Sequence, residues 1–550
     1  MLQGRNSLAL GDNFAAIDAL NKLLLLPPNN YTQDGQEWVG VARERAGQLD
    51  KAKVEFDLYL KLYKTPEGVT RIKARLTSLG SKPPKTVSAT TDSGSEKQRP
   101  SQTIAYGSVS MHYYNGKSQY DTIDNANQFS SNLSQSSFSG VDQSALLSSI
   151  IASERFISDK YDNRIVFQGT SYTNYLPGQT GQTRLGAAYF EVKNKLIDYS
   201  VRLGRQSSNG GGVLGRFDGA AVGYGLSPSI RLNAVAGQLS DYNVGSAPVF
   251  YGASVDIGSV SFFAINQTID GLVERRAVGA DYRYFETNKS AFLTLDYDVI
   301  FSALNVMMFQ GSYTETPERA YNLFLDHRRS PYLSLRNALY GANTSSITDL
   351  LQQISEDEVR ALAYDRTGTS NLIQLGVTQQ LTPRWQIGGD FRISNYESLP
   401  ASGKPVDIFA DPNSPPPIQG FYQETPSSGN DWAISPQLIG NNLFSSQDVT
   451  VLSLSYMGSP QYTGQSMYVY SRANFTDKWS IDLSLQYYRQ NFESGTTTSR
   501  FMPTLRTAYQ VRQSISLDVD FGFEVSHTET GTQITDGSRQ FYSLGFRWDF

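Results

Sequence analysis

From about residue 103 to the C-terminus, apolar and hydrophilic residues alternate with a period of two. In the clearest run, 514–526, one face carries Ile515, Leu517, Val519, Phe521, Phe523 and Val525, and the other carries Ser516, Asp518, Asp520, Gly522, Glu524 and Ser526. Runs at 199–204, 385–394 and 479–488 follow the same pattern. Because successive side chains of a β-strand point to opposite faces, these runs predict strands with one apolar and one hydrophilic face. Most are about ten residues long, enough for a tilted strand to cross a bilayer.

The composition removes several classes of protein. The 550 residues include no cysteine and only three histidines, His112, His327 and His527, which lie far apart in the sequence. Disulfides, thiolate zinc sites and histidine-based metal chemistry are therefore not expected. The formal charge of −5 does not suggest a nucleic-acid binder. No apolar run approaches the roughly 18 residues of a membrane helix, which leaves the β-barrel as the membrane class that fits.

Three features favour a membrane barrel over a soluble β-propeller or sandwich, which also alternates. The hydrophilic face shows no second core. Aromatic residues recur near the strand ends, at Trp385, Trp479, Tyr456, Tyr487 and Tyr242. The chain ends in an alternating apolar series, Tyr542, Leu544, Phe546, Trp548 and Phe550. This last series resembles the C-terminal strand of bacterial outer-membrane proteins, which implies recognition by the barrel-assembly machinery.

Short and long connections between the runs differ in a regular way. Tight ones occur at 194–195, 226–229, 286–289, 381–384 and 476–478, and long polar ones occur near 116–145, 205–216, 239–248, 395–432, 492–499 and 527–539. Short turns on one side and longer loops on the other are typical of outer-membrane barrels. We therefore predict a large antiparallel transmembrane β-barrel over 103–550 with an even number of strands, about 16–22.

The stretch 315–370 lacks the strand pattern. A helix is expected to begin near Ser346 and to include Leu350 and Leu351. The flanking turns place the start of this stretch on the short-turn side of the barrel and its end on the long-loop side. The stretch must therefore contain one more strand, which could lie near 331–340. A second hypothesis is that this helical insert threads the lumen and plugs it. Exposure of Leu350 and Leu351 outside the barrel would rule the plug out.

Residues 1–80 follow a helical pattern in two sets with an offset of 36 residues. One set contains Gly4, Gly11, Ala16, Leu20, Leu23 and Pro28, and the other contains Gly40, Gly47, Ala52, Phe56 and Tyr59. These spacings resemble the tetratricopeptide repeat, a helix–turn–helix unit that implies docking of protein partners. A generic pair of helical hairpins is the alternative. In the repeat register Met1 falls inside a helix, so we expect an N-terminally truncated array. Residues 81–102 are almost free of apolar side chains and predict a disordered linker.

Two motifs suggest chemistry that their context does not support. Gly210, Gly212 and Gly215 match the dinucleotide-binding spacing, but they join two predicted strands and no helix is expected after them. We interpret them as a flexible loop. Asp326–Arg329 is interpreted as polar structure within the insert. No GxSxG nucleophile elbow is present. The prediction is a protein that is not an enzyme and uses neither a cofactor nor a metal.

Charged residues on the hydrophilic faces are the candidate pore-lining residues. They are Arg202, Arg205, Arg216, Asp218, Asp390, Arg392, Asp518, Asp520 and Glu524. In one interpretation they pair with one another and hold the shape of the barrel. In the other they set the selectivity of a pore, because rings of charge bias which solutes enter.

Helical repeats followed by an outer-membrane barrel resemble the exopolysaccharide export porins. The resemblance lies in domain order and in the C-terminal strand. It implies a pore that passes a polar polymer, with the repeats docking a periplasmic protein partner. Outer-membrane lipid, lipopolysaccharide and the barrel-assembly machinery would be further partners, and nucleic acid would not. A surface-lipoprotein translocator and a passive diffusion porin remain as alternatives.

Overall fold

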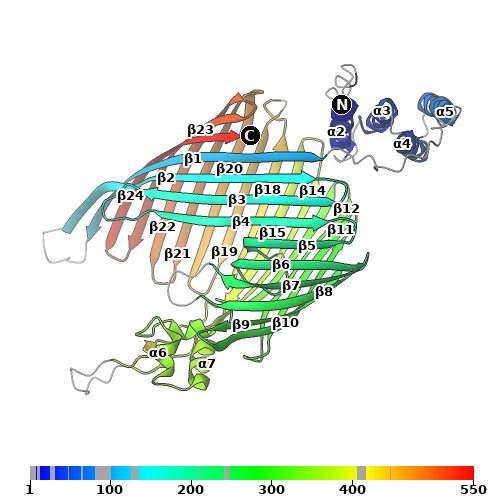
Figure 1. Ribbon diagram of the computed structural model, residues 1–550. Coiled ribbons are helices and arrows are strands. Elements are labelled where there is room, and N and C mark those ends of the chain that lie inside the picture. The colour runs from blue at the N-terminus through cyan, green and yellow to red at the C-terminus, as the bar shows by residue number, and fades with distance from the viewer. Residues whose placement is uncertain are drawn as a thin grey trace. The chain divides into compact units, whose positions relative to one another are not determined.

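The chain folds into two compact units, residues 1–97 and 98–550 (Figure 1). The computed structural model describes residues 8, 13–24, 31–46, 49–63, 66–80, 101–124, 134–208, 210–240, 247–405, 416–445 and 447–550. The division between the units falls inside the predicted linker at 81–102, of which 81–100 lie outside the described residues. The aromatic residue Tyr242, singled out in the sequence, also lies outside them.

The first unit contains helices α2 (Asn13–Leu24), α3 (Thr32–Arg45), α4 (Leu49–Leu62) and α5 (Pro66–Gly80). Each packs against the next along the chain. Ala16, Leu20 and Val39 are buried in one cluster. The adjacent cluster contains Val41, Ala52, Phe56, Tyr59 and Ile72. Helices are thus present where the helical pattern was predicted, and their identity as tetratricopeptide repeats stays a prediction.

Helices α3 and α4 are in close contact where Gly40 faces Phe56, and this contact is possible because glycine has no Cβ. A Cβ at Gly40 would lie 2.4 Å from the Phe56 ring. We therefore expect Gly40→Val to separate the two helices and destabilise this unit by about 1–3 kcal/mol, the usual cost of overpacking. Limited proteolysis of the full chain should show faster cleavage within 31–62. Val54→Ala, a change at an exposed position of α4, should leave the cleavage rate unchanged.

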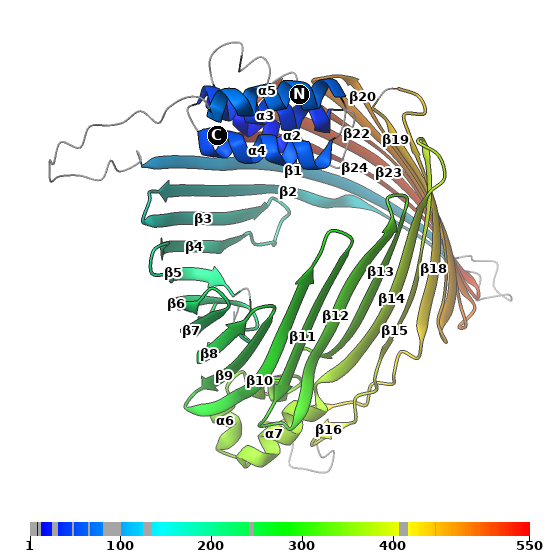
Figure 2. The same cartoon turned by 90° about the vertical axis from the view of Figure 1, so that its right-hand side faces the viewer.

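The second unit is a closed antiparallel ring of 22 strands, counted over the described residues (Figures 1 and 2). Each strand pairs with its neighbours in chain order, and β1 pairs with both β2 and β24, which closes the ring. The ring strands are β1 (Gln102–Asp124), β2 (Ser134–Ile157), β3 (Tyr161–Asn174), β4 (Gln182–Asn194), β5 (Tyr199–Ser207), β6 (Arg216–Ser227), β7 (Ile230–Leu239), β8 (Val249–Ile257), β9 (Val260–Ile269), β10 (Leu272–Phe285), β11 (Lys289–Asp298), β12 (Ala303–Thr316), β13 (Arg319–Ser330), β14 (Gly368–Gln380), β15 (Trp385–Tyr396), β18 (Asp431–Asn441), β19 (Val449–Gly458), β20 (Tyr462–Thr476), β21 (Trp479–Phe492), β22 (Thr496–Arg512), β23 (Ile515–Thr530) and β24 (Gln533–Asp549). The predicted barrel with an even strand number is confirmed.

The two ends of the ring differ in their connections. All five predicted tight turns lie at the end where β1 begins and β24 ends, which we call the short-turn end. The opposite end, the long-loop end, carries the connections after β1, β5, β7 and β15, and a two-stranded sheet of β16 (Ser402–Gly403) and β17 (Phe421–Tyr422) lies in the last of these. The predicted loops at 116–145, 492–499 and 527–539 are wrong for the most part, because β1, β2 and β21–β24 continue through them. Between β21 and β22 and between β23 and β24, only short turns remain.

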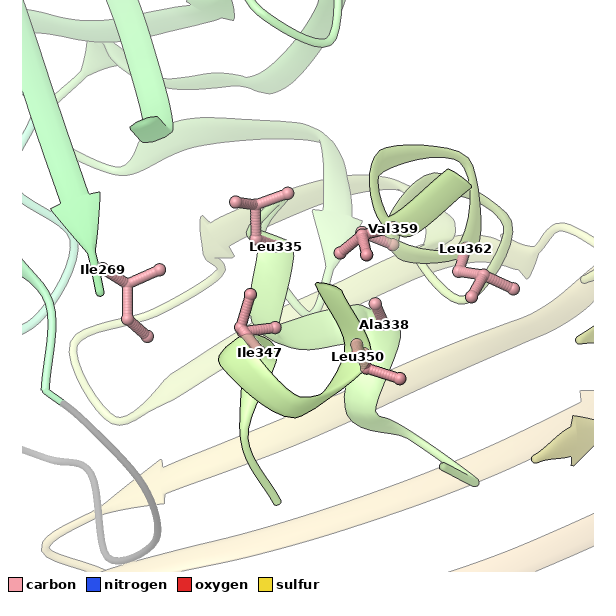
Figure 3. Packing of buried hydrophobic residues seen from close by; sticks show 8 residues of the cluster. Ile269, Leu335, Ala338, Ile347, Leu350, Val359 and Leu362 are labelled. Carbon is pink, nitrogen blue, oxygen red and sulfur yellow. The ribbon is translucent and has the colours of Figure 1, made fainter. Parts of the chain in front are cut away.

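The strand missing from the sequence interpretation is β13, and it lies before the predicted position at 331–340. Residues 331–367, which follow it, hold a 3-10 helix, η1 (Leu335–Leu339), and helices α6 (Ile347–Leu351) and α7 (Glu356–Asp365). We call this segment the rim insert. Its core joins residues of all three helices to one residue of β9; the core members are Ile269, Leu335, Ala338, Ile347, Leu350, Val359, Leu362 and Ala363 (Figure 3).

The rim insert lies at the edge of the ring and does not thread it. In both views α6 and α7 lie beside the ends of β9 and β10 at the long-loop end (Figures 1 and 2). Leu350 is buried within the insert's own core. Because the insert lies beside the strand ends in both views, the hypothesis of a plug that threads the lumen is wrong. The predicted helix start is confirmed, since the Ser346 side chain accepts from the Asp349 N–H. α7 begins with a capping box in which hydrogen bonds from the backbone and side chain of Ser355 lower the pKa of Glu358.

The two faces of the ring have different chemistry. On β23, Leu517, Val519 and Phe521 point outward and are 42–52% exposed, whereas the intervening Asp518 is 8% exposed and points inward. Trp385 and Trp479 begin β15 and β21 at the short-turn end. The outer face is therefore an apolar belt and the inner face is polar, as the alternation predicted. No helix among the described residues has the length and apolar character needed to span a membrane.

Candidate functional site

A hollow of about 580 Å³ lies on the inner wall where β4–β10 face the lumen. It is lined by polar side chains that include Glu191, Arg202, Arg231, Asp256, Asp281 and Arg283. Three of these are cationic and three are anionic, so the hollow carries mixed charge. Such a surface can hydrogen-bond a small polar solute of either sign.

Most charges of the hollow are fixed by hydrogen bonds to neighbouring or next-neighbouring strands and turns. Arg202 Nη2 donates to Glu191 Oε1 at 2.7 Å across the β4–β5 pair. Arg231 donates to Asp198 Oδ1 at 2.8 Å and to the Ser200 hydroxyl at 2.6 Å. Charged hydrogen bonds of this kind hold both partners in one geometry, which makes the wall a pre-organised surface.

The acidic part of the hollow is held by neutral donors. Asn233 Nδ2 donates to Asp256 Oδ2 at 2.9 Å, and Thr294 Oγ1 donates to Asp281 Oδ1 at 2.8 Å. Asp281 is 5% exposed. These carboxylates lie on the lumen side of the wall and give a bound cationic group a place to interact.

The described residues of the connection between β5 and β6, 208 and 210–215, fold onto the inner wall, and Gly210 and Gly211 line this hollow. We call these residues the inward loop. Four of its glycines, Gly210, Gly211, Gly212 and Gly215, have positive φ, a conformation that favours glycine. Val213 packs against a buried apolar cluster of Phe217, Leu239, Phe250, Ile265 and Ala277. The glycine-rich motif therefore joins two strands, as predicted, but the loop is anchored to the wall and is not a nucleotide fingerprint.

Gly212 is the tightest point of the inward loop. Its carbonyl accepts from Arg275 Nη1 at 2.9 Å, and a Cβ there would lie 2.5 Å from the Phe263 ring. We expect Gly212→Val to dislodge the loop for two reasons. Valine disfavours the positive φ of 74° at this position, and its side chain would clash with the Phe263 ring. Single-channel recordings should show larger open-state fluctuations. Gly215→Ala keeps a strained φ but has no atom within 4 Å, so a much smaller effect is expected.

A buried polar network joins the inward loop to the rim insert. Arg275 on β10 forms an ion pair with Asp296 on β11, and each side chain is 2% exposed. Asn305 Nδ2 donates to Asp296 Oδ1 at 3.3 Å, and Asn305 Oδ1 accepts from the Leu333 N–H at 3.1 Å. One continuous set of bonds thus runs from Gly212 to the start of the insert.

A second arm of this network involves Glu274, which is fully buried. Its carboxylate accepts from Gln267 Nε2 at 2.8 Å and from the Ser334 hydroxyl. Arg360 of α7 also donates to the Val273 carbonyl at 2.9 Å. The long-loop ends of β9–β12 and the rim insert are therefore one bonded structure.

The predicted acidic residues of β23 lie on the inner face and pair with arginines of β22. Arg506 lies 3.7 Å from Asp518 and 3.5 Å from Asp520, and Arg500 lies 3.1 Å from Glu524. The distances fit the interpretation in which charges pair between strands and hold the barrel's shape. A role in selectivity stays a prediction.

Asp390 and Arg392 also lie on the inner face of β15. They alternate with Phe391 and Ile393, which belong to the apolar outer face. In register, Asp390 lies opposite Gly376 and Ser435, and Arg392 lies opposite Gln374 and Ala433. Their neighbours are thus small or polar, which leaves both charges facing the lumen.

Three predicted pore-lining residues are misplaced. Arg205 donates two hydrogen bonds to Asp218, at 2.7 and 2.6 Å, and the pair lies in register with the outward residues of β5 and β6, which include Leu203 and Val222. Arg216 shares the face of Asp218 by the period of the strand. Only Arg202 of this group faces the lumen. The cause is parity: Arg202 and Arg205 are three residues apart and therefore occupy opposite faces.

The sequence interpretation missed Arg231, Arg275, Asp281 and Asp296. A signal was available for Arg231, because it alternates with Leu232 and Ala234 in a period-two run. Asp281 and Asp296 likewise lie one residue from apolar or aromatic outward positions. Nothing in the sequence indicates that Arg275 and Asp296 meet. Among the described residues, no group of three His, Asp or Glu side chains is arranged to hold a metal ion.

Comparisons with known proteins give only distant likenesses. No protein-family model and no curated protein sequence matches the chain. OccAB3 of Acinetobacter baumannii is 6% identical with a TM-score of 0.34, over 81% of this chain and 99% of that chain. OpdK of Pseudomonas aeruginosa, solved with vanillate, is 8% identical with a TM-score of 0.33, over 81% and 99%. OccK2 (OpdF) of the same organism is 9% identical with a TM-score of 0.33, over 81% and 98%. These values are too low to transfer a family, a substrate or a residue's role to this chain.

Proposed function

We propose that this protein is an outer-membrane channel through which small polar and charged solutes diffuse. The observation that carries the proposal is the closed ring of 22 strands with an apolar outer face and a polar inner face. A closed sheet leaves no unpaired strand edge, which is the condition for a sheet to span a bilayer. The proposal places the barrel in a bacterial outer membrane.

The height of the apolar belt supports this location. Trp385 lies in register with Gly440 near the short-turn end, and Trp432 lies eight residues from Gly440 toward the long-loop end. Eight residues span ~27 Å along a strand at ~3.4 Å each. A tilt of about 40° reduces this to ~21 Å, close to the roughly 25 Å of an outer-membrane belt.

In this orientation the short-turn end faces the periplasm and the long-loop end faces outward. The C-terminal residues Tyr542, Leu544, Phe546 and Trp548 are all exposed on the outer face of β24, and Phe550 follows it. They are available to the barrel-assembly machinery, whose recognition of them is part of the proposal.

Docking of a periplasmic protein by the helical unit is a further and less detailed part of the proposal. Ala16, Ala52 and Phe56 are fully buried between helices, so they hold the unit together and cannot themselves contact a partner. Gly11 and Gly47 lie outside the described residues. A partner would have to bind exposed positions such as Val54, Leu58 and Leu62 on α4.

The inner wall favours small solutes over a polymer. The inward loop is fixed against the wall, and the hollow beneath it has the volume of a small-molecule site, which is typically about 300–1,000 Å³. Balanced charges in the hollow suit solutes that carry groups of both signs. In the described part of the chain, polymer export and lipoprotein translocation, the other interpretations of the sequence, have no comparable feature in their favour.

Heat-modifiability and conductance test the proposal together. The purified chain folded in detergent should migrate differently on an SDS gel before and after boiling, because a closed barrel resists unheated SDS. In a planar bilayer it should conduct ions without partner proteins. A heat-modifiable protein that never conducts would contradict the channel, and trapped periplasmic polymer in a deletion strain would favour export instead.

A further inference from the structure

An apolar groove of about 760 Å³ runs along the outer face of β12–β18 within the apolar belt. Its outward walls include Phe309, Leu323, Leu375, Phe391 and Ile434. A second hollow, of about 380 Å³, continues from it across β18–β21 and shares Ile434 and Pro436. Figure 2 shows these strands side by side along one flank of the ring.

Small residues create the groove. Gly311, Gly389 and Pro436 occupy outward positions, and Gly389 pairs with Pro436. Their branched partners on adjacent strands are Leu323 and Val377. At Gly389 a Cβ would meet nothing closer than the Pro436 Cα, at 3.7 Å, so the space above this glycine is open. The apolar belt therefore has, at this flank, a groove that a hydrocarbon chain can fill.

A row of hydrogen-bonded polar side chains lies directly above the groove on the same strands. His327 Nδ1 lies 2.6 Å from Asn371 Oδ1, Asn371 Nδ2 donates to Asn395 Oδ1 at 2.9 Å, and Asn395 Nδ2 donates to Asn430 Oδ1 at 3.4 Å. We call these four residues the outer polar row. Each lies four positions closer to the long-loop end than a groove residue, which is Leu323, Leu375, Phe391 or Ile434, and Asn430 directly precedes β18.

Arg329 supplies positive charge beside this row, and Arg489 supplies it three strands beyond β18, next to the second hollow. Arg329 lies two residues beyond His327, with its guanidinium 4.7 Å from the Tyr364 ring centre and 2.8 Å from the Tyr364 hydroxyl. Arg489 lies on the outer face of β21, two residues beyond Tyr487 of the second hollow. In the described part of the chain, neither arginine forms an ion pair with a carboxylate. Asp326 and Asp431 are each one position from a residue of the row, and by the period of their strands they lie on the opposite, inner face. Glu397 lies two positions after Asn395.

We propose that this flank binds one molecule of lipopolysaccharide, with acyl chains in the groove and phosphorylated sugars on the outer polar row and the two arginines. The inference rests on the proposed location in the outer membrane. Amide side chains both donate and accept hydrogen bonds, which suits sugar hydroxyls, and arginine pairs well with phosphate. The row crosses three strand intervals, ~14 Å at ~4.8 Å each, wide enough for a disaccharide headgroup with several chains.

The experiment compares lipid retained by the full chain and by matched variants. Protein is extracted in mild detergent from the outer membranes of a lipopolysaccharide-producing host and analysed by native mass spectrometry. The double variant Arg329→Gln/Asn395→Leu removes headgroup contacts, and Gly389→Leu fills the groove. Arg276→Gln, on the outer face of β10, and Gly169→Leu, on the outer face of β3, are the controls. A Cβ at Gly169 meets only ordinary contacts at 3.6–3.7 Å.

The unmutated chain should retain lipopolysaccharide at about one molecule per barrel. The double variant and Gly389→Leu should each retain at least about fivefold less, as expected when one or two charged hydrogen bonds or the chain contacts are lost. Both controls should match the unmutated chain. Equal retention in all five proteins, or retention of phospholipid in place of lipopolysaccharide, would overturn the proposal.

Heat-modifiability separates failure of this site from failure of the proposed function. Each variant is checked for the mobility shift before its lipid is measured, and the headgroup variant tests the site independently if Gly389→Leu does not fold. A normal shift with unchanged lipid overturns the lipid site alone. Loss of the shift in the unmutated chain overturns the outer-membrane barrel and, with it, the lipid site.

Discussion

Asp296→Ala is expected to destabilise the long-loop end of the barrel by about 3–5 kcal/mol, because it removes the carboxylate that forms an ion pair with a buried arginine. Arg275 and Asp296 are both 2% exposed, so water cannot replace the lost partner. Arg275 also holds the inward loop through the Gly212 carbonyl. The temperature at which the fast-migrating gel form disappears should fall, and channel recordings should become noisier.

Two further variants establish the cause. Asp536→Asn weakens the His527–Asp536 pair, whose side chains are 48% and 65% exposed, and should have little effect. Replacing both partners with apolar residues, Arg275→Met/Asp296→Leu, should recover most of the thermal stability, because neither member of the ion pair is then left buried without the other. The recordings should stay noisy, since the methionine side chain has no donor for the Gly212 carbonyl. If Asp296→Ala behaves like Asp536→Asn, the ion pair does not hold the loop.

The strands of the barrel were predictable wherever one face stayed apolar and the other stayed polar along the whole strand. On β23 the apolar and polar residues alternate through the whole belt, and the structure follows that run. β13 was missed because it leaves the belt partway along its length. Its outward residues change from Leu323 and Leu325 to His327 and Arg329, which belong to the polar rim, so the alternation stops while the strand continues.

The lumen was less predictable than the strands, and parity explains part of this. Arg202 and Arg205 are close in sequence but lie on opposite faces, so clustering of charge along the chain did not indicate a cluster in space. The position of the inward loop depends on Phe263 and Arg275, which are some fifty to sixty residues away from Gly212 in sequence. Contacts of that range cannot be read from a local pattern.

Deletion of residues 541–550 is expected to abolish the heat-modifiable form altogether. These residues pair with Ser108–Gly116 of β1 on one side and with β23 on the other, and they close the ring within the apolar belt. Phe550 adds two backbone hydrogen bonds to Gly107, at 2.8 and 3.0 Å. Without them, two strand edges would expose unpaired backbone groups to lipid, at a cost of several kcal/mol for each group.

Loss of closure can be distinguished from simple shortening by a deletion in the same hairpin. Removing Thr528, Glu529, Ile534 and Thr535 deletes two register pairs near the tip of β23–β24 and keeps every outward residue on its face. This variant retains the whole β1–β24 seam from Ser108 to Asp121 and should still shift on boiling. Both deletions shorten β24, but only the 541–550 deletion opens the β1–β24 seam. A heat-modifiable 541–550 deletion would show that the ring is stable with an open edge.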